Sequence, residues 1–273
     1  PDGRIEAGVW ENGRLKYVKP VTPPAISQET KPPSTEQKKP KAKSGSIGAG
    51  SGFFISKTGQ LISNAHVVRD CKRVTVGDSA KRQIPAELIA TDLRNDLALL
   101  SISSLDKASA NTKSLVEKLG VGIVPLASAG LLRSRDVALG EDVLVAGFPY
   151  SSFASDAIKV TGGMVSSVVG FGDDSGKFQI DAAVQPGNSG GPIYDKSGNI
   201  VGVTVTRLNK VVVAKMTGSL PENTNFAIKA SIVRLFLSSN GVPAKASKKT
   251  TKVEKTDVAK IAERQTLLVI CHR

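Results

Sequence analysis

Short runs of β-branched and apolar residues, separated by Gly, Asp and Ser, fill the chain from Ser51 onwards and restrict its fold more than any other feature. Strand-length runs at this regular spacing are typical of an all-β sandwich or barrel. Helical periodicity is scarce, so we expect mostly antiparallel strands, and about twelve of them suit two small β-barrels. The expected strands cover residues 52–55, 61–63, 73–76, 84–90, 97–102, 142–146, 158–169, 177–181, 192–194, 200–206, 210–215 and 225–228, with short helices at 104–119 and 230–238.

The composition of the chain changes on both sides of this β-rich domain, which we place at residues 47–241. Residues 1–19 contain Asn12-Gly13, a strong hairpin-turn signal. They resemble a single MORN-type repeat unit, and a docking hairpin is the alternative. Residues 20–46 form a linker rich in Pro and Lys, and residues 242–273 form a lysine-rich tail that ends in a short strand. Such compositions bury little apolar surface, so we expect flexible basic N- and C-terminal extensions.

The charge balance of the chain is strongly basic. The formal net charge is +13, from 37 Lys and Arg against 24 Asp and Glu, and lysine is dense at residues 31–43 and 245–260. These lysine-rich tails predict binding to an anionic surface or polymer, and solvated tails without a partner are the alternative. Nothing indicates a specific nucleic-acid site. No apolar run reaches the ~18 residues of a transmembrane segment.

Two cysteines, Cys71 and Cys271, are too few for a disulfide framework. They form one bridge in an oxidising compartment or remain two reduced thiols in a reducing one, and both alternatives stay open. A bridge would fix the C-terminal tail to the first barrel if the strand at 266–270 packs beside it.

The sequence Gly187-Asn188-Ser189-Gly190-Gly191-Pro192 precedes a short apolar strand. A serine hydroxyl is a poor nucleophile unless a base takes its proton and donors hold the oxyanion that forms. Flanking glycines permit a tight turn in which backbone N–H groups converge on one point. We therefore expect Ser189 to be a nucleophile and the loop Gly187, Asn188 and Ser189 to form an oxyanion hole, with the N–H groups of Gly187 and Ser189 as donors.

His66 and Asp96 complete a predicted catalytic triad. His66 lies at the end of an apolar run, and the chain has only one other histidine, His272, beside its C-terminus. Asp96 leads directly into a β-run, where it can orient an imidazole ring. The chain order His, Asp, Ser is that of the chymotrypsin type. A buried histidine and a turn aspartate are the structural alternatives for each residue alone.

From about residue 46 to 241 the chain resembles the trypsin-like serine proteases of bacteria, most closely the protease domain of the HtrA/Deg family. The segments that carry this resemblance are 50–56, 63–68, 95–100, 140–149, 179–192 and 225–228. It implies two perpendicular six-stranded antiparallel barrels with the triad in the cleft between them. It also implies no metal and no cofactor, protein or peptide substrates, and a periplasmic or secreted location. The chain departs from the family in having no PDZ-sized segment after residue 240, so PDZ-based regulation is not expected from it.

The resemblance also assigns a primary specificity pocket. Ala183 would form its floor, and its walls would comprise Val205, Thr206, Arg207, Asn225 and Phe226. An uncharged floor favours a small aliphatic residue before the cut, whereas Arg207 would favour an acidic residue if it pointed inward. The expected function is a serine endopeptidase that works through an acyl-enzyme, and a catalytically silent binding module on the same fold is the alternative.

Overall fold

The computed structural model describes residues 7–11, 14–19, 47–56, 59–102, 131–150, 157–206 and 224–273. The chain divides into two units, Pro1–Lys43 and Ser44–Arg273. In the first unit, strands β1 (Ala7–Glu11) and β2 (Arg14–Lys19) pair as an antiparallel hairpin. The linker predicted at 20–46 lies outside the described residues, and the MORN-type interpretation of the hairpin stays a prediction.

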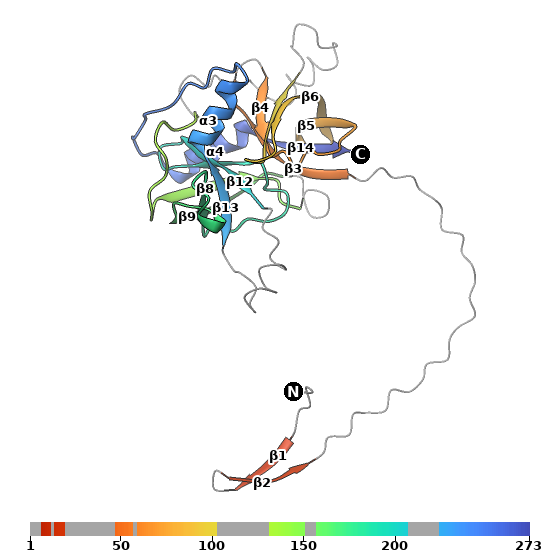
Figure 1. Cartoon of the computed structure of the whole chain (residues 1–273), viewed down its shortest axis with the longest axis vertical. Helices are drawn as coiled ribbons and strands as arrows, with labels where there is room; N and C mark the ends of the chain where they lie inside the picture. The colour runs from red at the N-terminus through yellow and green to blue at the C-terminus, as the bar shows by residue number, and fades with distance from the viewer. Residues whose placement is uncertain are drawn as a thin grey trace, which may run out of the picture. The chain divides into compact units, whose positions relative to one another are not determined.

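The first barrel of the larger unit closes in the order β14-β3-β4-β7-β6-β5 (Figure 1). Its strands are β3 (Ile47–Phe54), β4 (Gln60–Ser63), β5 (Arg73–Ser79), β6 (Arg82–Asp92), β7 (Leu97–Ser101) and β14 (Thr266–His272). Apolar side chains such as Leu61, Val76, Leu100 and Val269 form a buried core inside it. Closure pairs every strand on both sides, so no edge is left open.

The second barrel closes in the order β10-β13-β12-β11-β8-β9. Its strands are β8 (Asp142–Gly147), β9 (Lys159–Ser167), β10 (Lys177–Ile180), β11 (Pro192–Tyr194), β12 (Ile200–Val205) and β13 (Asn225–Lys229). A one-turn 3₁₀ helix, η1 (Phe171–Asp173), lies between β9 and β10. The prediction of an all-β fold with two six-stranded antiparallel barrels is therefore confirmed.

The C-terminal residues are the part of the fold where the prediction was wrong in part. We expected 242–273 to be a flexible tail that ends in a short strand at 266–270. The strand is confirmed as β14. The flexibility is not, because β14 pairs with β3 along its whole length and with β5 on its other side (Figure 1). Six of its seven residues are buried. A strand with neighbours on both sides satisfies all its backbone groups, which the lysine-rich composition before it does not reveal. The strand expected at 210–215 lies outside the described residues.

In the part of the chain that the structure describes, two helices pack against the barrels. Helix α3 (Ala230–Ser239) matches the helix expected near the end of the β-rich domain. Helix α4 (Lys255–Gln265) was not expected, because the lysines in this segment obscure a short buried face made of Val258, Ala262 and the polar Gln265. The helix expected at 104–119 lies outside the described residues. No helix among the described residues is long and apolar enough to cross a bilayer.

One hydrophobic cluster joins the barrels and both helices. It combines Phe53 and Leu99 of the first barrel with Tyr194 of the second. The Tyr194 hydroxyl also donates to Gln265 Oε1 over 2.9 Å, and Gln265 Nε2 donates to the Phe54 carbonyl over 2.9 Å. This shared core and its buried hydrogen bonds fix one barrel against the other, which positions the loops at their junction.

Candidate active site

His66 and Asp96 come together because strands β4 and β7 are paired neighbours. Ser63, at the end of β4, lies opposite Ala98 near the start of β7. The residues just beyond these positions therefore meet at one end of the pair. His66 Nδ1 lies 2.6 Å from Asp96 Oδ2, and the His66 backbone N–H donates to Asp96 Oδ1 over 2.9 Å. Both carboxylate oxygens of Asp96 thus hold the histidine.

The turn around Asp96 is itself fixed by hydrogen bonds. Its carbonyl accepts from Asn64 Nδ2 over 2.8 Å and from the Ala65 N–H over 3.2 Å. Asp96 has φ of 59°, a left-handed conformation that Asp tolerates better than most residues. The residue is 8% exposed. A buried carboxylate on Nδ1 fixes the tautomer in which Nε2 is the free base.

The loop that carries Ser189 needs glycine at two positions. Gly187 and Gly190 have φ of 105° and 85°. A Cβ at Gly190 would lie 2.2 Å from the Ser51 carbonyl oxygen, and one at Gly187 would lie 2.4 Å from that of Phe148. Neither position can hold a side chain without moving backbone, so these glycines let the loop approach both barrels closely.

Ser51, on β3 of the first barrel, holds this loop of the second barrel. Its hydroxyl donates to the Gly187 carbonyl over 2.7 Å and accepts from the Phe148 N–H over 2.9 Å. Its own N–H donates to the Ser189 carbonyl over 2.7 Å. Ser51 is fully buried. Two hydrogen bonds from this one residue therefore fix the loop that carries Ser189 across the barrel junction, and the third connects Ser51 to Phe148.

The backbone N–H groups of the loop that carries Ser189 differ in whether they already donate a hydrogen bond. The Asn188 N–H donates to the Gln185 carbonyl over 3.0 Å, so this residue of the predicted oxyanion hole is already engaged in a turn. Within the described residues, the N–H groups of Gly187 and Ser189 donate no such bond. These two groups are the available donors for an oxyanion.

The Ser189 side chain is hydrogen-bonded to Thr206 rather than to His66. Its Oγ pairs with Thr206 Oγ1 and accepts from the Thr206 N–H over 3.3 Å. Among the described residues, no hydrogen bond joins Ser189 to His66. The three residues therefore do not form a continuous chain of hydrogen bonds in this structure.

Most of the residues predicted for specificity come from neighbouring strands. Val205 pairs with Phe226 across β12 and β13, and Thr206 follows directly. Asn225 Nδ2 donates to the carbonyl of Ala182 over 2.8 Å, which brings β13 to the residue before Ala183. Ala183 is exposed. Arg207 lies outside the described residues.

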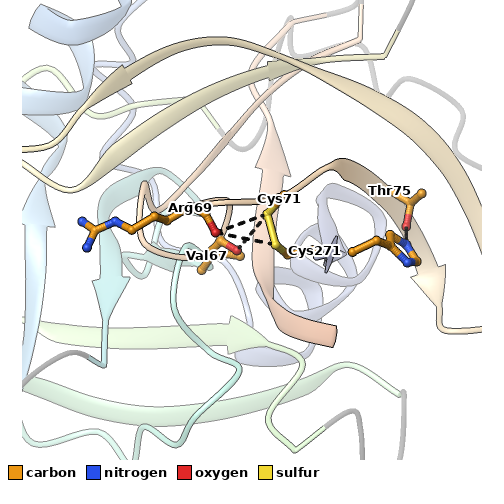
Figure 2. The surroundings of a disulfide bond; sticks show 6 residues. Val67, Arg69, Cys71, Thr75 and Cys271 are labelled. Atoms are coloured by element: carbon orange, nitrogen blue, oxygen red, sulfur yellow. Dashed lines mark hydrogen bonds between the residues drawn. A yellow bond between two sulfur atoms is a disulfide. The ribbon is translucent and has the colours of Figure 1, made fainter. Parts of the chain in front are cut away.

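A disulfide joins Cys71, in the loop after His66, to Cys271 on β14 (Figure 2). The Cα atoms are 5.3 Å apart, within the range of such bonds. The Arg69 carbonyl oxygen lies 3.7 Å and 3.8 Å from the two sulfur atoms. The bond ties the histidine loop to the C-terminal strand. Within the described residues, no group of three or more His, Cys, Asp or Glu side chains could hold a metal ion.

The comparisons with known proteins assign this arrangement to a family. A family model described as a trypsin-like peptidase domain matches residues 50–203, a span that includes His66, Asp96 and Ser189. The chain belongs to the trypsin-like peptidase family. The recognition of a trypsin-like, HtrA-type protease domain from the sequence is thereby confirmed.

Relatives of this trypsin-like peptidase chain include two curated bacterial proteins. An uncharacterized protein y4bJ of Sinorhizobium fredii is 33% identical over 93% of this chain and 36% of its own length. A "Probable periplasmic serine endoprotease DegP-like" of Pseudomonas fulva is 36% identical over 56% of this chain and 28% of its own length. The chain therefore spans about a third of the length of the curated relatives it matches.

Solved structures support the same fold. A serine endoprotease from Yersinia pestis has a TM-score of 0.51 at 22% identity, over 72% of this chain and 63% of its own. The HtrA-type protease AlgW, solved with a decapeptide, has a TM-score of 0.51 at 25% identity, over 70% of this chain and 51% of its own. At 22% identity, the likeness to the Yersinia pestis structure supports the fold of this chain and carries no information on its function.

Two residues of the site were not predicted in the roles that the structure gives them. Ser51 lies in the Gly50-Ser51-Gly52 segment, where flanking glycines signal close backbone approach. Thr206 was expected only as a pocket wall, yet its hydroxyl contacts Ser189. Side-chain contacts between residues on different strands leave no periodic signal in the sequence.

Proposed function

We propose that this chain is a serine endopeptidase in which Ser189 is the nucleophile, His66 the general base and Asp96 the residue that orients it. The observation that carries the proposal is the 2.6 Å contact between His66 Nδ1 and Asp96 Oδ2 beside a loop whose geometry requires glycine on both sides of Ser189. The family match supports the same chemistry.

The reaction proceeds in two halves. Ser189 Oγ attacks the carbonyl carbon of the scissile bond while His66 Nε2 takes the hydroxyl proton. The N–H groups of Gly187 and Ser189 stabilise the negative oxygen that forms. His66 then gives the proton to the leaving amine, which breaks the C–N bond and leaves an acyl-enzyme. A water molecule then attacks the ester carbonyl carbon while His66 takes its proton. His66 returns this proton to Ser189 Oγ as the C–O bond breaks, which releases the carboxylic acid and restores the serine.

The substrates are protein or peptide segments with a small aliphatic residue before the cut. The exposed, uncharged Ala183 supports this preference, because no charge at the floor can pair with Lys or Arg. Profiling with peptides that differ only in Val, Ala, Arg or Glu at that position tests it. Cleavage after Glu at the highest rate would instead indicate that Arg207 contributes to the pocket.

The site of action is proposed to be the periplasm or the cell exterior. The Pseudomonas fulva relative is named a probable periplasmic endoprotease, and a structural disulfide such as Cys71–Cys271 is typical of oxidising compartments and rare in reducing ones. Mass spectrometry of protein isolated from its host under thiol-blocking conditions tests this. Alkylation of both cysteines without prior reduction would exclude an oxidising compartment.

Covalent labelling by a fluorophosphonate probe tests the catalytic proposal. We expect labelling of the wild-type chain and its loss in Ser189→Ala and His66→Ala. Ser239→Ala and His272→Gln serve as matched controls, since they remove a serine and a histidine outside the site. Retained labelling in Ser189→Ala would refute the assigned nucleophile.

A catalytically silent binding module is the second candidate. The specific observation in its favour is the hydrogen bond of Ser189 to Thr206 instead of His66. A folded wild-type chain that binds peptides but neither labels nor cleaves would support this candidate over the peptidase.

A further inference from the structure

A cavity of about 530 Å³ lies on the second barrel, away from the proposed triad. One wall comes from residues 133–142, before and at the start of β8, and another from the turn between β11 and β12. The third wall comes from residues 242–254, which we call the crossover segment because they connect α3 to α4. No triad residue lines this cavity, so it is not part of the peptidase site.

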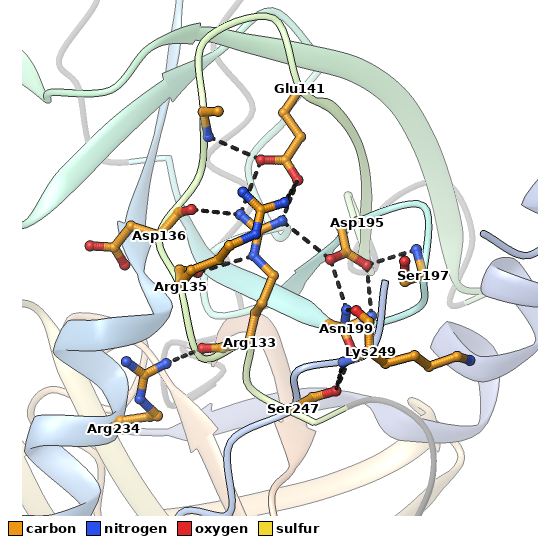
Figure 3. A network of polar contacts seen from close by, with 11 residues as sticks. Arg133, Arg135, Asp136, Glu141, Asp195, Ser197, Asn199, Arg234, Ser247 and Lys249 are labelled. Atoms are coloured by element: carbon orange, nitrogen blue, oxygen red, sulfur yellow. Dashed lines mark hydrogen bonds and ion pairs between the residues drawn. The ribbon is translucent and has the colours of Figure 1, made fainter. Parts of the chain in front are cut away.

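The cavity is built on a buried arginine (Figure 3). Arg133 is 3% exposed, and its guanidinium contacts Glu141 and Asp195, at 3.2 Å from Asp195 Oδ2. It also donates to the Arg135 carbonyl over 3.0 Å and to the Asp136 carbonyl over 2.9 Å. Two carboxylates face this one guanidinium, and Arg135 lies 3.9 Å from Glu141 as a second cation. Arg133 therefore fixes the cavity wall and has no charge left for a ligand.

The crossover segment is held rigidly against this wall. The Ser247 N–H donates to the Leu132 carbonyl over 2.8 Å, and its hydroxyl donates to Asn199 Oδ1 over 2.6 Å. Asn199 Nδ2 donates to the Lys249 carbonyl over 2.9 Å. The Val253 N–H donates to the carbonyl of Lys196 over 2.9 Å. These bonds lie on both sides of the lysines that face the cavity, so the cavity is largely preformed.

The cavity has an excess of positive charge. Six basic and three acidic side chains line it. The carboxylates are occupied, because Glu141 and Asp195 pair with Arg133 and Asp142 pairs with Lys196. Three lysines that line the cavity have no carboxylate partner among the described residues: Lys248, Lys249 and Lys252. These ammonium groups are the charges available to an anion.

The lining indicates the chemical class of that anion. Three hydroxyl groups lie beside the lysines and supply neutral donors, those of Ser134, Ser197 and Thr250. Among the described residues, no aromatic side chain lines the cavity, so they offer a nucleobase no stacking surface. The volume is in the ~300–1,000 Å³ range of small-molecule sites. We propose that this cavity binds a small, multiply charged oxyanion of the oligophosphate class.

Binding should stabilise the fold around the second barrel. The ligand would contact both the crossover segment and the turn between β11 and β12. Strand β11 begins three residues after Ser189. Because only the folded chain has this cavity, occupancy raises the unfolding midpoint by mass action. The inference is independent of the proposed peptidase function, since the two sites share no residue.

Isothermal titration calorimetry of the full chain with sodium tripolyphosphate tests the proposal. We expect saturable one-site binding at low salt that weakens as salt rises. The variant Lys248→Gln/Lys249→Gln/Lys252→Gln should bind at least about tenfold more weakly, since charge-assisted bonds are lost. The control Lys38→Gln/Lys39→Gln/Lys41→Gln removes the same net charge from the N-terminal lysine-rich stretch and should bind within about twofold of wild type.

The other outcomes overturn the proposal. Equal weakening in both triple variants would mean general attraction to a basic chain, and no saturable heat with wild type would mean no site. Citrate that binds as tightly as tripolyphosphate would exclude the oligophosphate class. If the cavity triple variant unfolds, Lys248→Gln/Lys252→Gln changes only exposed side chains and must still weaken binding.

Discussion

The hydroxyl of Ser51, on the first barrel, donates a 2.7 Å hydrogen bond to the carbonyl of Gly187, in the nucleophile loop of the second. The loop is therefore held from outside its own barrel. The same hydroxyl accepts from the Phe148 N–H, so it is satisfied as donor and acceptor at once. Preorganisation of this kind keeps backbone donors in place without cost at the moment of reaction.

Replacing Ser51 by alanine should lower both the stability of the chain and its peptidase activity. Loss of a buried hydroxyl that makes two hydrogen bonds costs about 1–3 kcal/mol of unfolding free energy. Misplacement of the nucleophile loop should lower kcat/KM by about 10- to 100-fold. The control Ser239→Ala removes a 2.9 Å bond to the Phe236 carbonyl on α3, and its kcat/KM should be unchanged. Equal kcat/KM for Ser51→Ala and wild type would show that the loop does not depend on this bond.

Removing the Thr206 hydroxyl should make Ser189 more reactive. The variant Thr206→Val keeps the side-chain shape but frees Ser189 Oγ to bond with His66. One hydrogen bond is worth ~0.5–1.5 kcal/mol, so fluorophosphonate labelling should become about two- to tenfold faster. Thr204→Val is the matched control, because the buried Thr204 hydroxyl has no hydrogen-bond partner within the described residues. Slower labelling of Thr206→Val would mean that Thr206 assists the reaction.

The Cys71–Cys271 bond should stabilise the whole fold. It connects residues 200 positions apart, and a native disulfide typically contributes about 2–5 kcal/mol. Guanidinium denaturation of Cys71→Ser/Cys271→Ser should therefore show a lower midpoint than the oxidised wild type. Adding reductant should lower the wild-type midpoint and leave the variant unchanged. A variant as stable as the oxidised protein would contradict the prediction.

Lowering the pH should weaken the ion pair between Arg133 and Glu141, because protonation removes the charge of the Glu141 carboxylate. Burial alone would raise the pKa of Glu141, but hydrogen bonds from Arg133 and the Ala138 N–H outweigh it and hold the pKa below its ordinary value of 4.5. A depressed folded-state pKa contributes stability above about pH 4.5 that is lost as pH falls through the folded value. Glu141→Gln should be less stable at pH 7 and lose less stability on acidification. Urea denaturation between pH 7 and 3 measures this, and Glu263→Gln, an exposed carboxylate on α4, should keep the wild-type slope.

Ending the chain at Gly241 should abolish folding. Such a chain lacks β14, which pairs with β3 and β5 and contributes Leu267 and Val269 to the barrel core. A five-stranded remnant would expose two strand edges and its apolar interior. Circular dichroism and solubility compared with the full chain test this. A soluble, cooperatively folding chain of residues 1–241 would show that β14 is dispensable.

The local patterns were sufficient for much of the fold and for the candidate triad. Alternating apolar runs predicted the strands of both barrels, because each strand records its own burial in its own residues. Gly187 and Gly190 indicated the tight loop around Ser189, since their positive φ is a local requirement. The run that ends at His66 and the run that begins after Asp96 indicated where those side chains lie along their strands.

Long-range pairing decided what these patterns could not. Lysine dominates the composition of residues 245–260, so nothing local shows that α4 turns an apolar face inward or that β14 completes the first barrel. The contacts of Ser51 with Gly187, of Thr206 with Ser189 and of Arg133 with Asp195 join residues far apart in the chain. The sequence by itself determined the strands, the barrels and the candidate nucleophile, because propensity and burial are read from neighbouring residues. Only the tertiary structure decided how the barrels hold the loop that carries Ser189 and where the crossover segment encloses a cavity, because those contacts form only after the chain has folded.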